Sequence, residues 1–213
     1  ILSVTVVGLT ALWTNYRYLE TAKRQQSLTM VSSFYQAQEN QLADLVVLTS
    51  SHLAFEVNDE LSNPAIIQEH LIGIHKGIPK IDAFIVCDFA GKIIAYSGTS
   101  IPLENCNLET NPGYTTYTIN GERQAWLLRG RKILDGNPES PTVILGKQLD
   151  DQLLMEMCNT CDLYHSIMQN DEMIATSFGS NYSERTNLRA LPSRFADVEF
   201  QKSYSMGGHI YYI

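Results

Sequence analysis

The chain opens with an uncharged, largely apolar run, residues 1–13, and then changes to a regular spacing of apolar and polar positions. From Met30 onward one stripe recurs every three or four residues, which is the spacing of one face of an α-helix. Its positions are Val31, Phe34, Gln38, Leu42, Leu45, Thr49 and Leu53, two of which are polar. The pattern predicts one helix to about Leu61, and the part from Thr14 would be about 70 Å long.

Beyond this helix the pattern predicts a second, shorter helix and then strands. Asn63-Pro64 provides an N-cap and a proline for the first turn, and Gly77 followed by Pro79 ends the helix. Asn120-Gly121 joins two strand-like segments and is the strongest short signal for a β-hairpin. The expected strands are residues 82–88, 92–97, 114–119, 122–132 and 142–147, with a loop at 98–113 and a short helix at 149–157. Strand patterns then restart at residues 162–169 and 173–177 and return at 196–205 and 209–213.

Composition and charge limit the partners of this chain. Hydrophobic residues make up 44% of the 213 residues and charged residues 18%, which is typical of a folded globular protein. The net charge is −8. Because nucleic-acid binding depends on basic side chains that release counterions from the phosphate backbone, the charge argues against a nucleic-acid partner.

The uncharged start predicts a membrane anchor. A transmembrane helix needs about 20 residues, more than residues 1–13 supply. We therefore expect residues 1–14 to be the end of a transmembrane helix, followed by an interfacial segment with Tyr16 and Tyr18. Residues 15–61 would form a long stalk and dimerisation helix. A cleaved signal peptide is one alternative, although no small-residue cleavage site follows Trp13, and a buried helix of a soluble protein is another.

Three segments carry a resemblance to a known family. They are IVCDFAGKIIAYSG at residues 85–98, VILGKQLDDQLLMEM at residues 143–157 and DLYHSIMQNDEMIATS at residues 162–177. They resemble a strand–turn–strand opening, a last strand leading into a connecting helix, and the start of a second lobe. This order is similar to that of the extracytoplasmic double sensor (tandem Cache, PAS-like) domains of bacterial transmembrane signalling receptors such as sensor histidine kinases.

The resemblance implies an α+β fold with two lobes. A long N-terminal helix would precede a PAS-like (Cache) lobe with a five-stranded antiparallel sheet at residues 62–148, distal from the membrane. A connecting helix at residues 149–161 would lead to a second, incomplete lobe of the same kind at residues 162–213. Because the sequence ends within a strand pattern at Tyr211-Tyr212-Ile213, we expect this membrane-proximal lobe to be truncated.

The resemblance also implies a function in signal transduction. The chain would be the periplasmic or extracellular ligand-sensing domain of a membrane receptor, such as a two-component histidine kinase, and would act as a homodimer. Binding of a small molecule would displace the stalk helix and relay the signal across the membrane. The sensor region itself is not expected to be an enzyme or to hold a cofactor, although the full-length protein could carry a kinase or cyclase output.

Five residues after the long loop are the candidates for ligand binding: Tyr114, Tyr117, Trp126, Arg129 and Arg131. Aromatic walls with fixed cations orient an anionic small molecule. Strand alternation, however, would place Trp126 and Arg129 on opposite faces. The alternative interpretation is a core tryptophan with solvated arginines. The amino-acid-recognition pattern of the family is not reproduced; Arg123, Trp126 and Arg129 match it only loosely.

The cysteines are the remaining candidates for chemistry. Cys158 and Cys161 form a CxxC motif that predicts a local disulfide between the lobes, with redox sensing as an alternative. Cys87 and Cys106 are a second candidate pair. No metal site is expected, because a single CxxC is weak and His70 and His75 lie five residues apart. Two functions of other classes remain open: a membrane-tethered thiol-disulfide protein using Cys158 and Cys161, and a pilin-like structural subunit.

Overall fold

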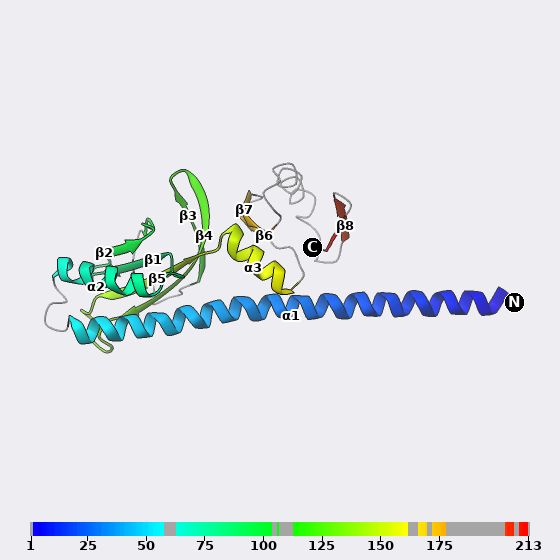
Figure 1. The fold of residues 1–213 in the computed structure, drawn as a ribbon, viewed down its shortest axis with the longest axis horizontal. Helices are drawn as coiled ribbons and strands as arrows, with labels where there is room; N and C mark the ends of the chain where they lie inside the picture. Colours follow the sequence, from blue (N-terminus) through cyan, green and yellow to red (C-terminus); the bar gives the residue numbers. More distant parts are fainter. Residues whose placement is uncertain are drawn as a thin grey trace.

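One long helix runs along almost the whole molecule, with the sheet packed against its C-terminal half (Figure 1). The computed structural model describes residues 2–57, 63–103, 106, 113–161, 166–169, 172–177, 203–206 and 209–212. Helix α1 (Leu2–Glu56) has 55 residues, or about 80 Å at 1.5 Å per residue. The predicted long N-terminal helix is therefore confirmed, with its last residue at Glu56. Within the described chain, no helix combines the length and hydropathy of a membrane span.

The predicted stripe of α1 is the face that packs against the sheet. Leu42 and Leu53 of the stripe are at most 1% exposed in the core of the sheet lobe, and Leu45 is partly buried against it. Val46, beside the stripe, is also buried. The two polar positions in the stripe differ in environment. Gln38 accepts a hydrogen bond from Lys147 Nζ at 2.6 Å, whereas Thr49 is buried, and its Oγ1 has no hydrogen-bond partner among the described residues. The polar positions of the stripe thus face the sheet lobe as the apolar positions do.

Helix α2 (Pro64–Gly77) begins and ends where the sequence predicted. Asn63 Oδ1 accepts a hydrogen bond from the backbone N–H of Ala65, which satisfies one of the free amides at the helix start. Ile67 and Leu71 bury one face of α2 in the same core as α1. Both helices therefore cover the same face of the sheet.

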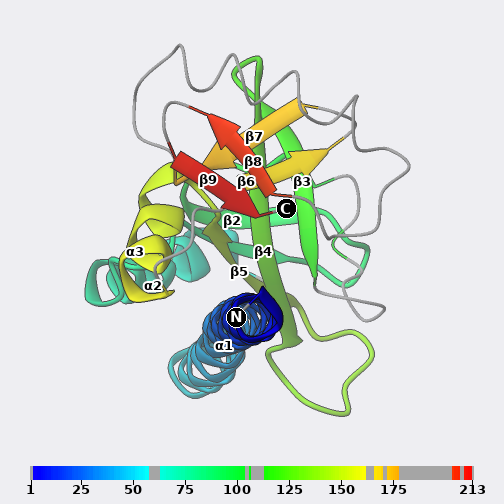
Figure 2. The ribbon, with the colours of Figure 1, turned by 90° about the vertical axis from the view of Figure 1, so that its right-hand side faces the viewer.

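The sheet has five strands in the order β2-β1-β5-β4-β3, and all neighbours are antiparallel. The strands are β1 (Ala83–Cys87), β2 (Ile93–Gly98), β3 (Tyr114–Ile119), β4 (Glu122–Lys132) and β5 (Thr142–Gln148). Figure 2 looks along α1, which lies beneath β4 and β5. The predicted hairpin turn between β3 and β4 is confirmed, because Asn120 and Gly121 both have positive φ, 54° and 83°.

The two faces of the sheet carry separate apolar clusters. We call the face that shares its core with α1 the stalk face, and Phe84, Leu127 and Leu145 lie on it. The opposite face, here the loop face, buries Ile85, Trp126 and Ile144 together with Ile101 and Cys106 of the segment after β2. One sheet thus separates two environments.

A second, smaller part of the fold follows the sheet. Helix α3 (Asp151–Cys161) leads to the antiparallel pair β6 (Ser166–Gln169) and β7 (Glu172–Thr176), and β8 (Ser203–Met206) pairs with β9 (His209–Tyr212). Asp151 Oδ1 accepts a hydrogen bond from Thr176 N at 2.8 Å, which ties the start of α3 to β7. Leu154 and Met157 of α3 pack with Phe34 of α1. The predicted α+β class, with a long helix and a five-stranded antiparallel sheet, is confirmed.

Candidate functional site

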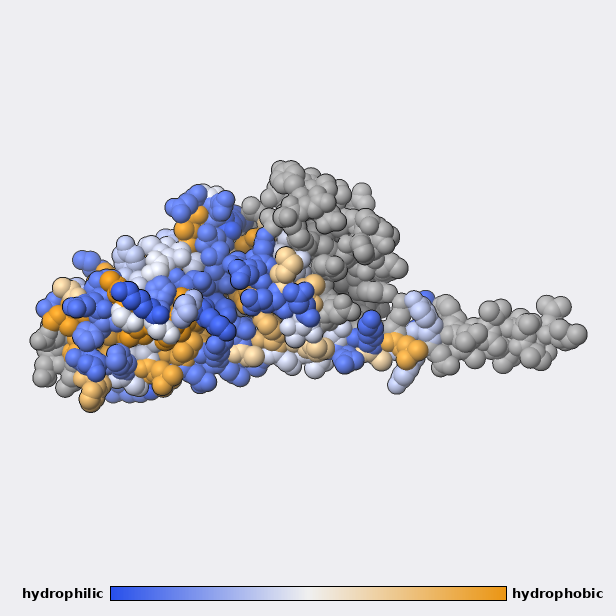
Figure 3. Space-filling view, in the orientation of Figure 1, coloured by the Kyte–Doolittle hydropathy of each residue, from blue (hydrophilic) through white to orange (hydrophobic). Residues whose placement is uncertain are grey.

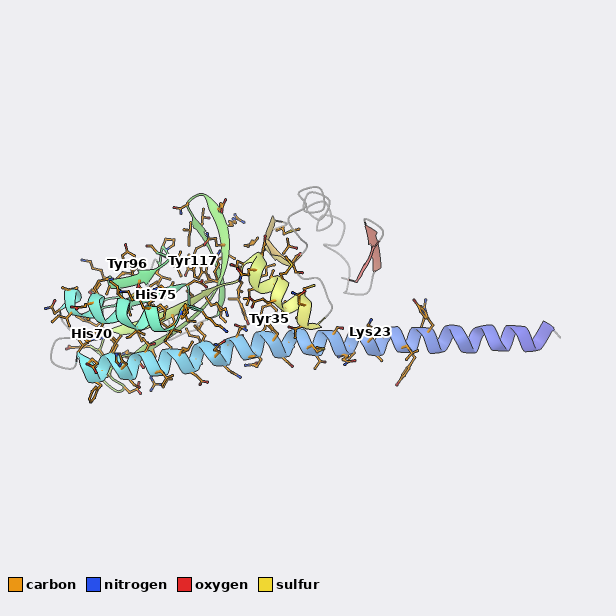
Figure 4. All side chains as sticks on the ribbon, in the orientation of Figure 1. Lys23, Tyr35, His70, His75, Tyr96 and Tyr117 are labelled. Carbon is orange, nitrogen blue, oxygen red and sulfur yellow. A yellow bond between two sulfur atoms is a disulfide. The ribbon has the colours of Figure 1, made fainter. Side chains whose placement is uncertain are left out.

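The five predicted ligand residues lie on β3 and β4, and the strand register divides them between the two faces of the sheet. Tyr114 is opposite Leu127 and Tyr117 is opposite Gln124. Directly opposed residues share a face, and neighbours along a strand alternate between faces. The stalk face therefore holds Tyr114, Arg129 and Arg131, and the loop face holds Tyr117 and Trp126. The structure does not bring the five together, and Figure 4 shows Tyr117 in the sheet, away from Tyr35 on α1.

The loop face contains a buried donor and a buried acceptor side by side. Trp126 is fully buried, and Gln124 lies two residues before it on the same face of β4. Among the described residues, neither Trp126 Nε1 nor Gln124 Oε1 has a hydrogen-bond partner. Leaving a buried polar group unpaired costs about 1–3 kcal/mol, so such groups call for a partner. A small molecule with one acceptor and one donor would complement this pair.

A disulfide holds the segment after β2 against the loop face. Cys87, at the end of β1, is bonded to Cys106, with 6.2 Å between the Cα atoms. Both cysteines are buried, at 0% and 3% exposure, in the cluster that contains Trp126. The bridge therefore fixes the segment after β2 to the apolar cluster that contains Trp126.

The two arginines of the stalk face pair with carboxylates. Arg131 forms an ion pair with Asp135, and both side chains are well exposed, so this contact contributes little stability. Arg129 NH2 lies 3.4 Å from Glu39 Oε2 of α1, with both side chains about one quarter exposed. The position of Arg129 thus links β4 to the stalk helix.

Tyr114 joins the same contact from β3. Its ring meets the ring of Tyr35 edge to face, with 5.8 Å between centroids. Partial burial raises the pKa of the Tyr114 hydroxyl, and the hydrogen bond to the Glu39 carboxylate raises that pKa further. Tyr114 thus adds a donor from β3 to the contact between Arg129 and Glu39.

A groove of about 720 Å³ opens beside these residues, where α1, the sheet and β6 meet. Its walls come from α1 (Ser32, Tyr35, Gln36, Glu39), from β3 (Tyr114, Thr115, Thr116), and from Ala125, Leu149 and Ile167. Of the five predicted ligand residues, only Tyr114 lines it. The volume falls within the range of small-molecule sites in proteins.

Of the remaining candidates, the second cysteine pair is only partly described and one histidine has a structural position. Cys158 lies half-buried near the end of α3, but the side chain of Cys161 is outside the described residues, so the bridge between them stays a prediction. His75 Nδ1 contacts Ser97 Oγ at 2.8 Å and its Nε2 contacts the carbonyl of Ile81 at 3.1 Å, which gives this histidine a structural position. No cluster of metal-ligating side chains occurs in the part of the chain that the structure describes.

The sequence analysis did not single out Gln124, the buried acceptor beside Trp126, or Glu39 and Tyr35, which line the groove beside Tyr114. Gln124 could have been found, because strand alternation already placed it on the same face as Trp126. Glu39 and Tyr35 gave no such signal, since polar and aromatic residues on a long amphipathic helix are usually solvated or packed. Their role depends on contacts with strands about 90 residues further along the chain, such as the one between Arg129 and Glu39.

Neither a protein-family model nor a curated protein matches this chain. Solved structures share its fold. The periplasmic domain of LuxQ from Vibrio cholerae matches with a TM-score of 0.50 and 13% identity over 76% of this chain and 84% of that one. A domain of a protein assigned to the sensory box/GGDEF family of Vibrio parahaemolyticus matches with a TM-score of 0.52 and 12% identity over 87% of both chains. The chain therefore has the fold of extracytoplasmic sensor domains, as the resemblance implied.

Proposed function

We propose that this chain is the ligand-sensing domain of a transmembrane signal-transduction receptor, such as a two-component histidine kinase, and that it lies outside the cytoplasm. The observation that carries the proposal is a sensor-domain fold whose sheet packs directly on a stalk helix, through Leu42, Val46 and Leu53. The region acts by binding and not by catalysis. Attachment to a membrane through residues 1–13 and pairing of two copies along α1 belong to the same proposal, motivated by the uncharged run and the helical stripe.

The ligand site of this proposal is the loop face at Trp126, Gln124 and Tyr117. The indole N–H can only donate, and the Gln124 Oε1 atom can only accept. Their burial favours a small molecule that pairs with both, because a hydrogen bond is strongest where water is excluded. The aromatic wall of Tyr117 and Trp126 supplies the apolar contact area of such a site.

The proposed transmission of the signal to α1 follows from the two faces of one sheet. A ligand that binds better to one arrangement of the loop face shifts the population toward that arrangement. Because the stalk face of the same strands packs on α1, the shift changes which position of the helix is favoured. A displacement of α1 would then carry the signal along its length of about 80 Å.

A thermal-shift screen of small metabolites on the full chain tests the ligand. A compound that binds only the folded state should raise the free energy of unfolding by about 2.7 kcal/mol at 100 times its Kd. Trp126→Phe keeps an aromatic side chain but removes the N–H donor together with part of the ring, so it should weaken binding about 3- to 10-fold. Trp13→Phe, the same change at the other of the two tryptophans, is the matched control. A screen without any stabilising compound contradicts the proposal, and equal affinity of both variants contradicts the site.

A further inference from the structure

A polar groove lies on the stalk face, away from the site proposed above. We propose that this groove is a second binding site and that it takes a small organic cation, a primary or substituted ammonium. The inference goes beyond the sensing function at Trp126 and does not depend on it. It rests on the charge, the ring geometry and the position of the groove.

The charge of the groove comes from Glu39. Among the described lining residues, Glu39 is the only charged one. Arg129 contacts its Oε2 at 3.4 Å but does not line the groove, and this partly exposed contact is weak. A carboxylate has about four lone-pair positions, so one guanidinium and the Tyr114 hydroxyl leave room for a further donor. The accessible wall therefore favours a positive ligand.

The rings beside Glu39 favour the same charge. Tyr35 and Tyr114 both line the groove and pack edge to face, with 86° between the ring planes. A cation within about 6 Å of such a ring centroid is attracted by the negative face of the ring. A carboxylate next to tyrosine rings thus selects an ammonium group by charge and by ring electrostatics together.

The remaining walls are suited to the rest of a small molecule. Ser32 and Gln36 of α1 and Thr116 of β3 supply hydroxyl and amide groups, and Leu149 and Ile167 supply apolar contact. The groove also joins three parts of the molecule, because Ser32 belongs to the stalk helix, Thr116 to the sheet and Ile167 to β6. A cation bound here would stabilise one arrangement of the three parts over others.

Isothermal titration calorimetry on the full chain tests this site with three probes of equal chain length. Butylammonium chloride is the cation, 1-butanol is the neutral analogue and sodium butyrate is the anion. We expect only butylammonium to bind. Glu39→Gln keeps the size of the side chain and removes its charge, so its Kd should rise about 10-fold or more, equivalent to about 1.4 kcal/mol. Asp44→Asn is the control, because Asp44 is an exposed carboxylate of α1 outside the groove.

A second variant keeps the test independent of the folding of Glu39→Gln. Tyr35→Leu leaves the carboxylate and removes one ring, and it should weaken butylammonium binding about 2- to 5-fold, because the cation loses its attraction to the ring face. Three results would overturn the proposal: no heat of binding at millimolar butylammonium, equal binding of 1-butanol, or equal loss of affinity in Asp44→Asn and Glu39→Gln.

Discussion

At the scale of single residues, Gln68 protects an open edge of the sheet. Strand β2 is an edge strand, and such strands present unpaired backbone groups that can pair with another chain. Gln68 Nε2 donates to the carbonyl of Tyr96 at 2.6 Å, and Gln68 Oε1 accepts from the N–H of Tyr96 at 3.0 Å. The side-chain amide thus takes the place of a neighbouring strand at one residue.

Replacing this amide should destabilise the lobe and favour association. Gln68→Leu removes two hydrogen bonds, and we expect the free energy of unfolding to fall by about 1–3 kcal/mol, measured by urea denaturation. Light scattering should show more self-association, because one N–H and one C=O of β2 become available. Glu69→Gln, an exposed change on the same helix, should alter stability by less than about 0.5 kcal/mol. A stable, monodisperse Gln68→Leu variant would contradict this role.

A buried carboxyl group makes the stability of the lobe depend on pH. Burial raises the pKa of Asp82 above its ordinary value of 3.8, while the hydrogen bond from Gln148 N to Asp82 Oδ2 opposes this. The folded state therefore holds the proton of Asp82 more tightly than the unfolded state. As pH rises from 3.8 through the folded pKa, the free energy of unfolding should lose the contribution of this group.

Asp82→Asn should remove this part of the pH dependence. Asparagine stays neutral and can still accept from Gln148 N, so urea denaturation above pH 3.8 should show a smaller fall in stability than in the unsubstituted chain. Asp88→Asn is a useful comparison, since Asp88 is an acid of the same lobe whose Oδ1 accepts from two backbone amides in a turn. A steeper fall in the Asp82→Asn variant would be the opposite of the expected sign.

At the scale of elements, the packing of α1 on the sheet depends on a few leucines. Leu53 is fully buried and Leu48 is 64% exposed, although both belong to the same helix. Leu53→Ala should lower the free energy of unfolding by about 2–5 kcal/mol, because it removes apolar contacts and leaves a cavity. Leu48→Ala is the matched control and should stay within about 0.5 kcal/mol. Chemical denaturation of the two variants distinguishes a packed stalk from one that only lies near the sheet.

The disulfide on the loop face gives a prediction for the segment after β2. Cys87 and Cys106 are 19 residues apart, and closing a loop of this size stabilises a protein by about 3 kcal/mol in the chain-entropy model. The double variant Cys87→Ala/Cys106→Ala should lose about that amount, and Trp126 should become easier to quench by iodide. Unchanged quenching would mean that the disulfide does not hold the segment after β2 against Trp126. The double variant should also be insensitive to reductant in this measurement.

The elements of the sheet lobe could be predicted because their signals are local. The positive φ values of Asn120 and Gly121 follow from a two-residue hairpin turn, and the alternation of β4 separates Trp126 from Arg129. The grouping of the ligand candidates could not be predicted in the same way. Tyr114 and Glu39 meet only after α1 and β3 pack, and no short-range pattern records that contact.

At the scale of the whole molecule, the described hydrophobic residues lie in separate patches on the face that Figure 3 shows. Figure 3 shows hydrophilic residues over much of the sheet lobe with apolar patches between them. Large exposed apolar residues of α1 include Leu19, Leu48 and Phe55, the last at 84% exposure. Helix α1 lies on the outside of the sheet (Figures 1 and 2), and these exposed residues are where the proposed pairing of two copies would be tested.

Adjacent residues of β4 reach both proposed sites, since Ala125 lines the groove and Trp126 is buried on the other face. Ligand binding at either proposed site would therefore act on the same two residues of β4. If the loop-face compound changes the Kd of butylammonium by some factor, a closed thermodynamic cycle requires butylammonium to change the Kd of that compound by the same factor. Through such heterotropic linkage, strand β4 would respond to two compounds at once. The signal from the receptor would then depend on the concentrations of both compounds together rather than on either concentration alone.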